Sequence, residues 1–150
     1  MATWERFEKE APELARVVRA RFEAAETHVL ATLRKDGSPR VSGSEVDFRG
    51  PDLSFGSMLG ARKAHDLQRD GRCAIHAHPS GDGDAKVAGV ALEVVDPGEK
   101  RDYTTGSEPP GDFHAFRLDL TEAVLTAVEN DELVIRVWRP GRAVETLRRR

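Results

Sequence analysis

The sequence lacks, or has few of, several features by which a chain is often assigned to a class of protein. Its one cysteine, Cys73, excludes an intrachain disulfide and is typical of a reducing compartment. No run approaches the ~18 apolar residues of a membrane-spanning helix, and the opening MATWERFEKE lacks the apolar stretch of a signal peptide. The formal net charge is only −3, which does not favour nucleic-acid binding. We therefore expect a cytoplasmic protein that binds neither nucleic acid nor a membrane.

The clearest helical periodicity lies in the first part of the chain. Apolar residues recur at spacings of three and four from Trp4 to Ala25, which predicts a helix over residues 3–25 with Thr3 as its N-cap. Pro12 interrupts this pattern, so we expect a kinked helix or two shorter ones. The chain has 150 residues, 39% of them hydrophobic, which is enough for one domain with its own core. Residues 1–26 are expected to cover that core.

From Thr27 the apolar pattern changes to a period of two, which is typical of strands. The turn Asp36-Gly37 predicts a hairpin over residues 27–48, and Asn130-Asp131 predicts a final hairpin. Gly89 lies inside another predicted strand and indicates a bulge or a close backbone approach.

The remaining segments complete a mainly β pattern. Strands are expected at 53–58, 72–78 and 85–96, a short helix at about 61–70, and a long exposed loop at 97–112. About six antiparallel strands without a βαβ rhythm predict a small barrel or sandwich. We assign this barrel to residues 27–139 and a solvated tail to residues 140–150.

The stretch GARKAHDLQRDGR, residues 60–72, places positive charge where a helix is predicted to begin. Such a position already carries partial positive charge, so Arg62 and Lys63 reduce stability there unless an anion binds. Free backbone N–H groups at a helix start form half of an anion site. Arg62 offers a planar fork to two phosphate oxygens, and Lys63 adds a point charge. The pattern favours a phosphate site over a merely solvated basic helix start.

The order of these segments resembles the pyridoxamine 5′-phosphate oxidase-like superfamily of flavin-binding split barrels. The similarity is clearest from Thr27 to Val95, in the phrases VLATLRKDGSPRVS, GARKAHDL and RDGRCAIH. In that family a Gly-Ser-Arg-Lys-Ala motif binds the flavin phosphate, and Ala61 stands here where Ser is common. The resemblance implies a six-stranded antiparallel split β-barrel with flanking helices. It also implies a homodimer that holds the cofactor at the interface of its two subunits.

The resemblance further implies which residues bind the cofactor. Arg62 and Lys63 match the phosphate-binding positions, and Ser57 matches a hydroxyl turned toward the same phosphate. Gly56 matches a neighbouring position that acts only through its backbone. The strand along the edge of the isoalloxazine ring corresponds to Arg40, Val41, Ser42, Gly43, Ser44 and Glu45. Family members often have Lys at the position of Glu45, and a carboxylate there disfavours an anionic reduced flavin.

The last residues of the chain differ in sequence from the C-terminal segment of the vitamin-phosphate oxidases in this superfamily. Trp138, Arg139 and Pro140 are followed by GRAVETLRRR, which does not match the segment that grips the substrate phosphate in those enzymes. The resemblance then implies an oxidoreductase of the broader group, dependent on FMN or on the deazaflavin coenzyme F-420. Such an enzyme transfers a hydride between the cofactor and a small organic substrate. Since the cofactor carries the chemistry, no catalytic residue is assigned.

Local charge favours the deazaflavin over FMN, because the deazaflavin tail ends in several carboxylates. The cations around the motif are Arg40, Arg62, Lys63, Arg69 and Arg72. Two alternatives to an enzyme stay open. One is a non-catalytic barrel that binds a cofactor or haem. The other is a barrel that has lost its cofactor and serves as an interaction module, which Glu45, Gly43 and Gly56 support.

Other polar clusters give weaker signals. His76 and His78 share one face of a predicted strand, but no third ligand follows at a suitable spacing, so no metal site is predicted. Asp82 and Asp84 resemble the start of a calcium loop without its distal Glu, and we reject that interpretation.

Overall fold

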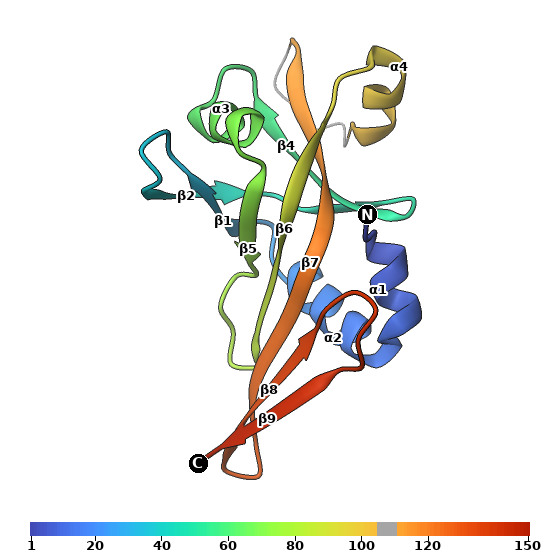
Figure 1. Cartoon of the computed structure of the whole chain (residues 1–150), viewed down its shortest axis with the longest axis vertical. Coiled ribbons are helices and arrows are strands. Elements are labelled where there is room, and N and C mark those ends of the chain that lie inside the picture. Colours follow the sequence, from blue (N-terminus) through green and yellow to red (C-terminus); the bar gives the residue numbers. More distant parts are fainter. Residues whose placement is uncertain (105–110) are drawn as a thin grey trace.

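A single antiparallel sheet curls into an open barrel in the computed structural model, which describes residues 1–104 and 111–150 (Figure 1). The strand order is β2-β1-β5-β6-β7-β4-β3, and β8 and β9 extend the sheet from β7. The strands of the described residues are β1 (His28–Leu33), β2 (Pro39–Ser44), β3 (Asp47–Arg49), β4 (Asp52–Met58), β5 (Arg72–His76), β6 (Asp84–Val94), β7 (Phe113–Glu129), β8 (Glu132–Trp138) and β9 (Glu145–Arg149). The predicted mainly β, barrel-like architecture with flanking helices is confirmed.

The described residues contain nine strands where the sequence predicted six. The hairpin expected over residues 27–48 ends at Ser44, and the chain beyond it forms β3, which pairs with β4 instead of β1. The residues expected as a tail, 140–150, include β9, which pairs with β8 over its full length. Every residue of β9 is exposed, so the strand adds backbone hydrogen bonds but no buried side chains. Because none of its side chains enters the core, the sequence of β9 has no alternating apolar pattern that would predict a strand.

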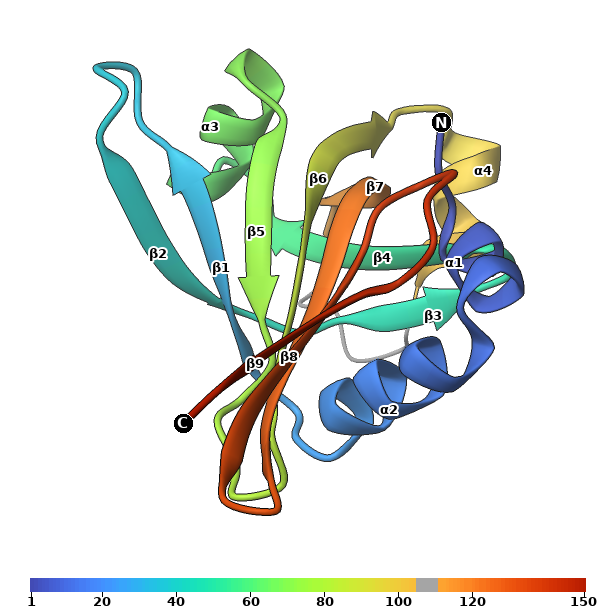
Figure 2. The same cartoon turned by 60° about the horizontal axis from the view of Figure 1, so that its bottom comes forward.

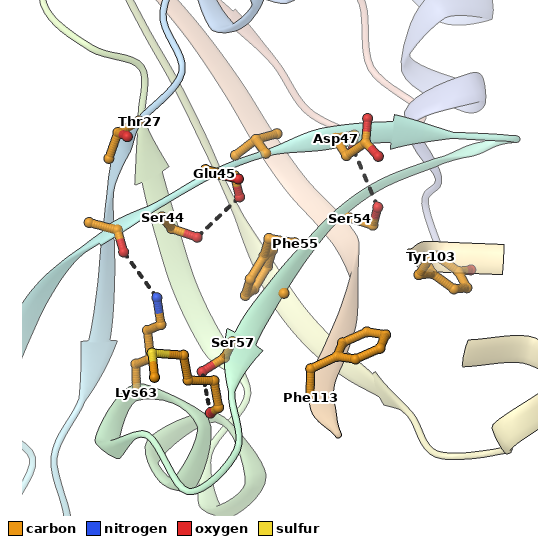
Figure 3. A pocket seen from close by; sticks show the side chains of 14 residues that line it. Thr27, Ser44, Glu45, Asp47, Ser54, Phe55, Ser57, Lys63, Tyr103 and Phe113 are labelled. Carbon is orange, nitrogen blue, oxygen red and sulfur yellow. Dashed lines mark hydrogen bonds between the residues drawn. The ribbon is translucent and has the colours of Figure 1, made fainter. Parts of the chain in front are cut away.

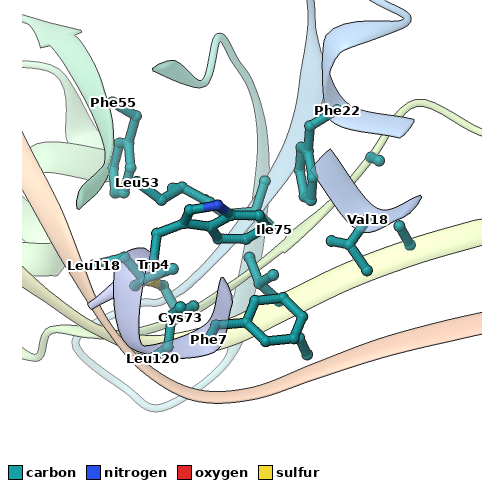
Figure 4. Close-up of a cluster of buried hydrophobic side chains, with 14 of the residues drawn as sticks. Trp4, Phe7, Val18, Phe22, Leu53, Phe55, Cys73, Ile75, Leu118 and Leu120 are labelled. Atoms are coloured by element: carbon teal, nitrogen blue, oxygen red, sulfur yellow. The ribbon is translucent and has the colours of Figure 1, made fainter. Parts of the chain in front are cut away.

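The two N-terminal helices cover the open side of the barrel (Figure 2). The predicted division into two shorter helices is confirmed, since Pro12 begins α2 (Pro12–Glu23) directly after α1 (Trp4–Glu10). Thr3 caps α1 by accepting from the Arg6 N–H at 3.1 Å. The apolar stripe faces inward, and Phe7 stacks on Trp138 of β8 with ring centres 4.5 Å apart. The buried cluster in Figure 4 joins Trp4, Phe7, Val18 and Phe22 to Leu53, Phe55, Ile75, Leu118 and Leu120.

Gly89 is required by a bulge in the long β6–β7 ladder. The pairing register shifts between Ala88 and Gly89, and a Cβ on Gly89 would lie 2.0 Å from the Asp119 carbonyl oxygen. The final hairpin turns at Asn130 and Asp131, whose φ values of 52° and 62° are those of a tight hairpin turn. Both sequence predictions are therefore confirmed.

Two further helices flank the barrel. α3 (Arg62–Arg69) lies across one end of β1 and β4, within the stretch predicted to be helical. α4 (Pro97–Lys100) and a 3₁₀ turn over Arg101–Tyr103 occupy the start of the segment expected as a long loop. The middle of that segment, 105–110, lies outside the described residues. Within the part of the chain that the structure describes, no helix has the length and apolar character needed to cross a membrane.

His28 is a buried histidine that joins α2 to the loop after β5, and it makes stability depend on pH. Its ring is 2% exposed, packs edge-on against Phe22, and accepts from the His78 N–H through Nδ1 at 2.9 Å. Burial is the main cause that lowers the pKa of His28 below its usual range.

Because the unfolded chain takes up a proton on His28 more readily than the folded chain, acidification favours unfolding. We expect the free energy of unfolding to fall by up to about 1.4 kcal/mol per pH unit from this residue once the pH drops below ~6.5. Urea unfolding at pH 7.5, 6.5 and 5.5 measures this slope, and His28→Gln should reduce it. An identical slope in the variant would assign the effect to other groups.

Candidate cofactor site

A cleft of about 540 Å³ opens between the end of β2, the β3–β4 hairpin and the first turn of α3 (Figure 3). This volume is in the range of small-molecule and cofactor sites. One end is polar and holds Lys63 and Ser57, whereas the other end is formed by the rings of Tyr103 and Phe113. The full lining comprises Thr27, Gly43, Ser44, Glu45, Val46, Asp47, Ser54, Phe55, Gly56, Ser57, Met58, Lys63, Tyr103 and Phe113.

Lys63 brings positive charge to the polar end of the cleft. Its Nζ donates to the Gly43 carbonyl oxygen of β2 at 3.0 Å, so the side chain spans from α3 to the neighbouring strand. Burial lowers the pKa of Lys63, and the Glu45 carboxylate on the same wall partly offsets this shift. A half-buried ammonium with one hydrogen bond can still donate to an anion that enters the cleft.

The first turn of α3 carries Lys63, and among the described residues the N–H groups of Arg62 and Lys63 have no hydrogen-bond acceptor, whereas the Ala64 N–H donates to the Ala61 carbonyl oxygen at 3.0 Å. Ala61 at the N-cap forms no side-chain capping bond, and the first turn contains no acidic residue. Arg62 is exposed and stands next to the cleft rather than in its lining. Uncapped N–H groups, a guanidinium and an ammonium together are the donor set that a phosphate group requires.

A buried ion pair fixes α3 in this position. Asp66, which is 3% exposed, accepts from Thr32 Oγ1 of β1 at 2.8 Å and from Arg40 Nε of β2 at 2.8 Å. Arg69 Nη2 lies 3.4 Å from the second carboxylate oxygen. Burial alone would raise the pKa of Asp66, but the hydrogen bonds from Arg40 and Thr32 outweigh it and hold that pKa below its usual range. Asp66 is therefore an ionised anchor between the helix and the barrel.

Gly56 leaves one wall of the cleft open to a flat ligand. Gly56 of β4 is exposed, and a Cβ there would meet only the His114 carbonyl oxygen, at 3.5 Å. Gly43 of β2 is also exposed, but the Thr27 side chain fills the space beside it, since a Cβ there would lie 3.3 Å from Thr27 Cγ2. A ligand can therefore approach the backbone of β4 closely at Gly56. An uncovered backbone wall with a phosphate donor set at one end fits a flavin mononucleotide.

The structure brings most of the predicted cofactor residues together and separates three from them. Six of the ten line the cleft: Gly43, Ser44, Glu45, Gly56, Ser57 and Lys63. Arg62 is adjacent to it. Arg40 pairs with Asp66, Val41 is 70% exposed on the outer face of β2, and Ser42 lies outside the lining.

Several lining residues were missed by sequence reasoning. Phe113 reaches the cleft because β4 pairs with β7, which sets Met58 opposite Phe113 across the sheet. Tyr103 reaches it from the turn after α4 and donates to Asp52 at 3.3 Å. No local pattern signals either contact, since both depend on strand pairing over long sequence separations. Asp47 and Ser54 lie opposite each other in the β3–β4 hairpin, and neither was assigned to the site although both lie in predicted strands.

In residues 1–104 and 111–150, no group of three or more His, Cys, Asp or Glu side chains is arranged to hold a metal ion. Cys73 is buried, and burial raises the pKa of its thiol to about 12, so it stays protonated.

An open antiparallel barrel with flanking helices and a cleft beside a basic helix start is the architecture of a split barrel. A family model described as pyridoxamine 5′-phosphate oxidase matches residues 14–127, well over half of the chain. The chain belongs to this family. Among curated proteins, none matches the sequence significantly.

Solved structures share this fold at low sequence identity. An FMN-binding, pyridoxamine 5′-phosphate oxidase-related protein from Nostoc punctiforme has a TM-score of 0.67 and 13% identity, covering 100% of this chain and 98% of that one. PhzG from Burkholderia lata, in complex with tetrahydrophenazine-1-carboxylic acid, has a TM-score of 0.60 and 17% identity, covering 91% and 88%. A heme binding protein from Mycobacterium smegmatis has a TM-score of 0.59 and 18% identity, covering 89% and 57%.

Proposed function

We propose that this protein binds FMN in the cleft and acts as an oxidoreductase on a small organic substrate. The observation that carries the proposal is the combination of Lys63, Arg62 and the uncapped start of α3 at one end of a cleft with an open backbone wall. Membership of the family and the FMN-binding neighbour support it. A bound flavin supplies two-electron hydride chemistry, which none of the protein's side chains provides.

The chain's own residues have binding and orienting roles in this proposal. Arg62, Lys63 and the N–H groups of the first turn of α3 hold the phosphate, with the Ser57 hydroxyl beside them. The backbone from Gly43 to Glu45 lies along one edge of the ring, and Gly56 leaves room for its face. Phe113 and Tyr103 border the far end and exclude water from it.

The ion pairs around α3 favour FMN over the deazaflavin. Of the five cations near the motif, Arg40 and Arg69 pair with Asp66, and Arg72 pairs with Asp70 at 2.7 Å. Among the described residues, only Arg62 and Lys63 of these five have no carboxylate within ion-pair distance. Two such cations suit one phosphate group. The longer anionic tail of coenzyme F-420 would need more positive charge, so the local charge that favoured the deazaflavin is largely neutralised.

Removing the phosphate contacts tests the assignment directly. We expect Arg62→Ala to weaken FMN binding by on the order of 2 kcal/mol, or about 30-fold, because a charge-assisted hydrogen bond contributes ~1.5–3 kcal/mol. Lys63→Ala should have a smaller effect, since its ammonium is already bonded to Gly43. Quenching of flavin fluorescence measures both affinities, with parallel titrations of F-420 and haem.

The matched control is Arg72→Ala, which removes an exposed arginine that pairs with Asp70 away from the cleft. This variant should bind FMN like the wild type. Unchanged FMN affinity in the Arg62→Ala, Lys63→Ala double variant would contradict the site. If F-420 or haem bound more tightly than FMN, that compound would be the cofactor in place of FMN.

We also propose that the protein is a homodimer, because the outer face of the sheet beside the cleft carries an apolar row of residues. Directly opposed residues lie on the same face, and one row across β2, β1, β5 and β6 reads Val41, Ala31, Ala74 and Ala88. A second copy that packs on this face by two-fold symmetry would cover it and border the cleft. The stripe on α1 and α2 is not available for this contact, since it is buried in the core.

A charge placed in this row is expected to dissociate the dimer. Val41→Arg puts a guanidinium at a position that is 70% exposed in the single chain, so its fold is retained while the paired state loses an apolar contact. Analytical ultracentrifugation at micromolar concentration should show a dimer for the wild type and a monomer for the variant. A monomeric wild type would refute the assembly.

A further inference from the structure

The loop that leads into α3 is held by a histidine from a distant strand. The Gly60 N–H donates to His114 Nε2 at 3.2 Å, and the positive φ of 76° at Gly60 turns its N–H toward that ring. His114 belongs to β7 and pairs with Ser57 of β4. The same histidine therefore contacts the chain between the end of β4 and the residues Arg62 and Lys63.

A second set of contacts connects this histidine to the other end of α3. His114 Nδ1 lies 2.9 Å from Glu93 Oε2, and Glu93 Oε1 accepts from Gln68 Nε2 at 2.9 Å. Gln68 is in the last turn of α3. Because Nε2 accepts from Gly60, the neutral ring carries its proton on Nδ1 and donates it to Glu93. This His114 relay, made of Gly60, His114, Glu93 and Gln68, clamps both ends of the helix to β6 and β7.

We propose that His114 is a positioning residue that sets the affinity for the FMN phosphate by holding Gly60 and the first turn of α3. The inference rests on the proposed function, since it requires the phosphate to bind at Arg62 and Lys63. The neutral ring offers Gly60 an acceptor. Losing this acceptor would free the loop before α3 and weaken its hold on the phosphate.

The test compares FMN with riboflavin, which has the same ring and no phosphate. We expect His114→Leu to weaken FMN binding about tenfold and riboflavin binding less than twofold, since one loop hydrogen bond acts only on the phosphate end. His114→Gln supplies an amide oxygen as a replacement acceptor, so it should retain most of the FMN affinity. His65→Leu, on the exposed face of α3, is the matched control and should change neither affinity.

Amide hydrogen exchange separates positioning from a merely structural role. The Gly60 amide should exchange its hydrogen faster in His114→Leu than in the wild type, because its acceptor is removed. Equal losses for FMN and riboflavin, or an unchanged exchange rate at Gly60, would overturn the role of His114 and leave FMN binding intact. Failure of the wild type to bind either flavin would overturn the proposed function and this inference with it.

Discussion

Asp66→Asn is expected to lower the free energy of unfolding by about 3 kcal/mol, because removing one partner of a buried ion pair leaves an uncompensated charge. Asp66 is 3% exposed, and Arg40 and Thr32 both direct their donors at one of its oxygens at 2.8 Å. An asparagine keeps the volume but cannot balance the Arg40 guanidinium. Urea unfolding at pH 7 measures the change.

The matched control for this variant is Asp70→Asn. Asp70 follows the last turn of α3 and pairs with Arg72 at 2.7 Å, but it lies in contact with water. Contact with Arg72 lowers the pKa of Asp70 to about 2, yet water and salt screen such a surface pair, so we expect little change in stability. Equal destabilisation by the two variants would contradict the anchoring role of Asp66.

The anchor at Asp66 also shows what sequence reasoning about the site could not foresee. Arg40 was assigned to the flavin edge together with its five successors, although consecutive residues of a strand point to opposite faces. This alternation alone places the Val41 side chain on the opposite face of β2 from the side chains of Arg40 and Ser42. The contact that the Arg40 side chain makes depends on Asp66, which lies 26 residues further along the chain. This ion pair follows from the docking of α3 on the barrel.

Features encoded by local chemistry were predicted well. Pro12 divides the first helix, Asn130 and Asp131 turn the last hairpin, and Gly89 forms a bulge, because each depends on the backbone of a few residues. The charge at the start of α3 was also visible as a local conflict with the helix dipole. The aromatic end of the cleft was not visible in the sequence, because Phe113 meets β4 only through strand pairing over a long sequence separation.

Gly56→Leu is expected to weaken FMN binding at least about 100-fold, which corresponds to ~2.7 kcal/mol. Gly56 lines the middle of the cleft between Ser54 and Met58, and alternation places its missing side chain on their face of β4. A leucine there would occupy the space that the proposal gives to the flavin ring. The fold should tolerate it, since the new Cβ meets only the His114 carbonyl oxygen at an ordinary distance of 3.5 Å.

Flavin titration together with thermal unfolding distinguishes a blocked cleft from a damaged fold. We expect the melting temperature of Gly56→Leu without flavin to stay close to that of the wild type, while the added stability that FMN confers on the wild type disappears. Gly81→Leu places the same side chain in an open part of an exposed loop, and it should retain both properties. Wild-type FMN affinity in Gly56→Leu would show that the ring does not bind against β4, and the flavin would then have to be placed elsewhere on the barrel.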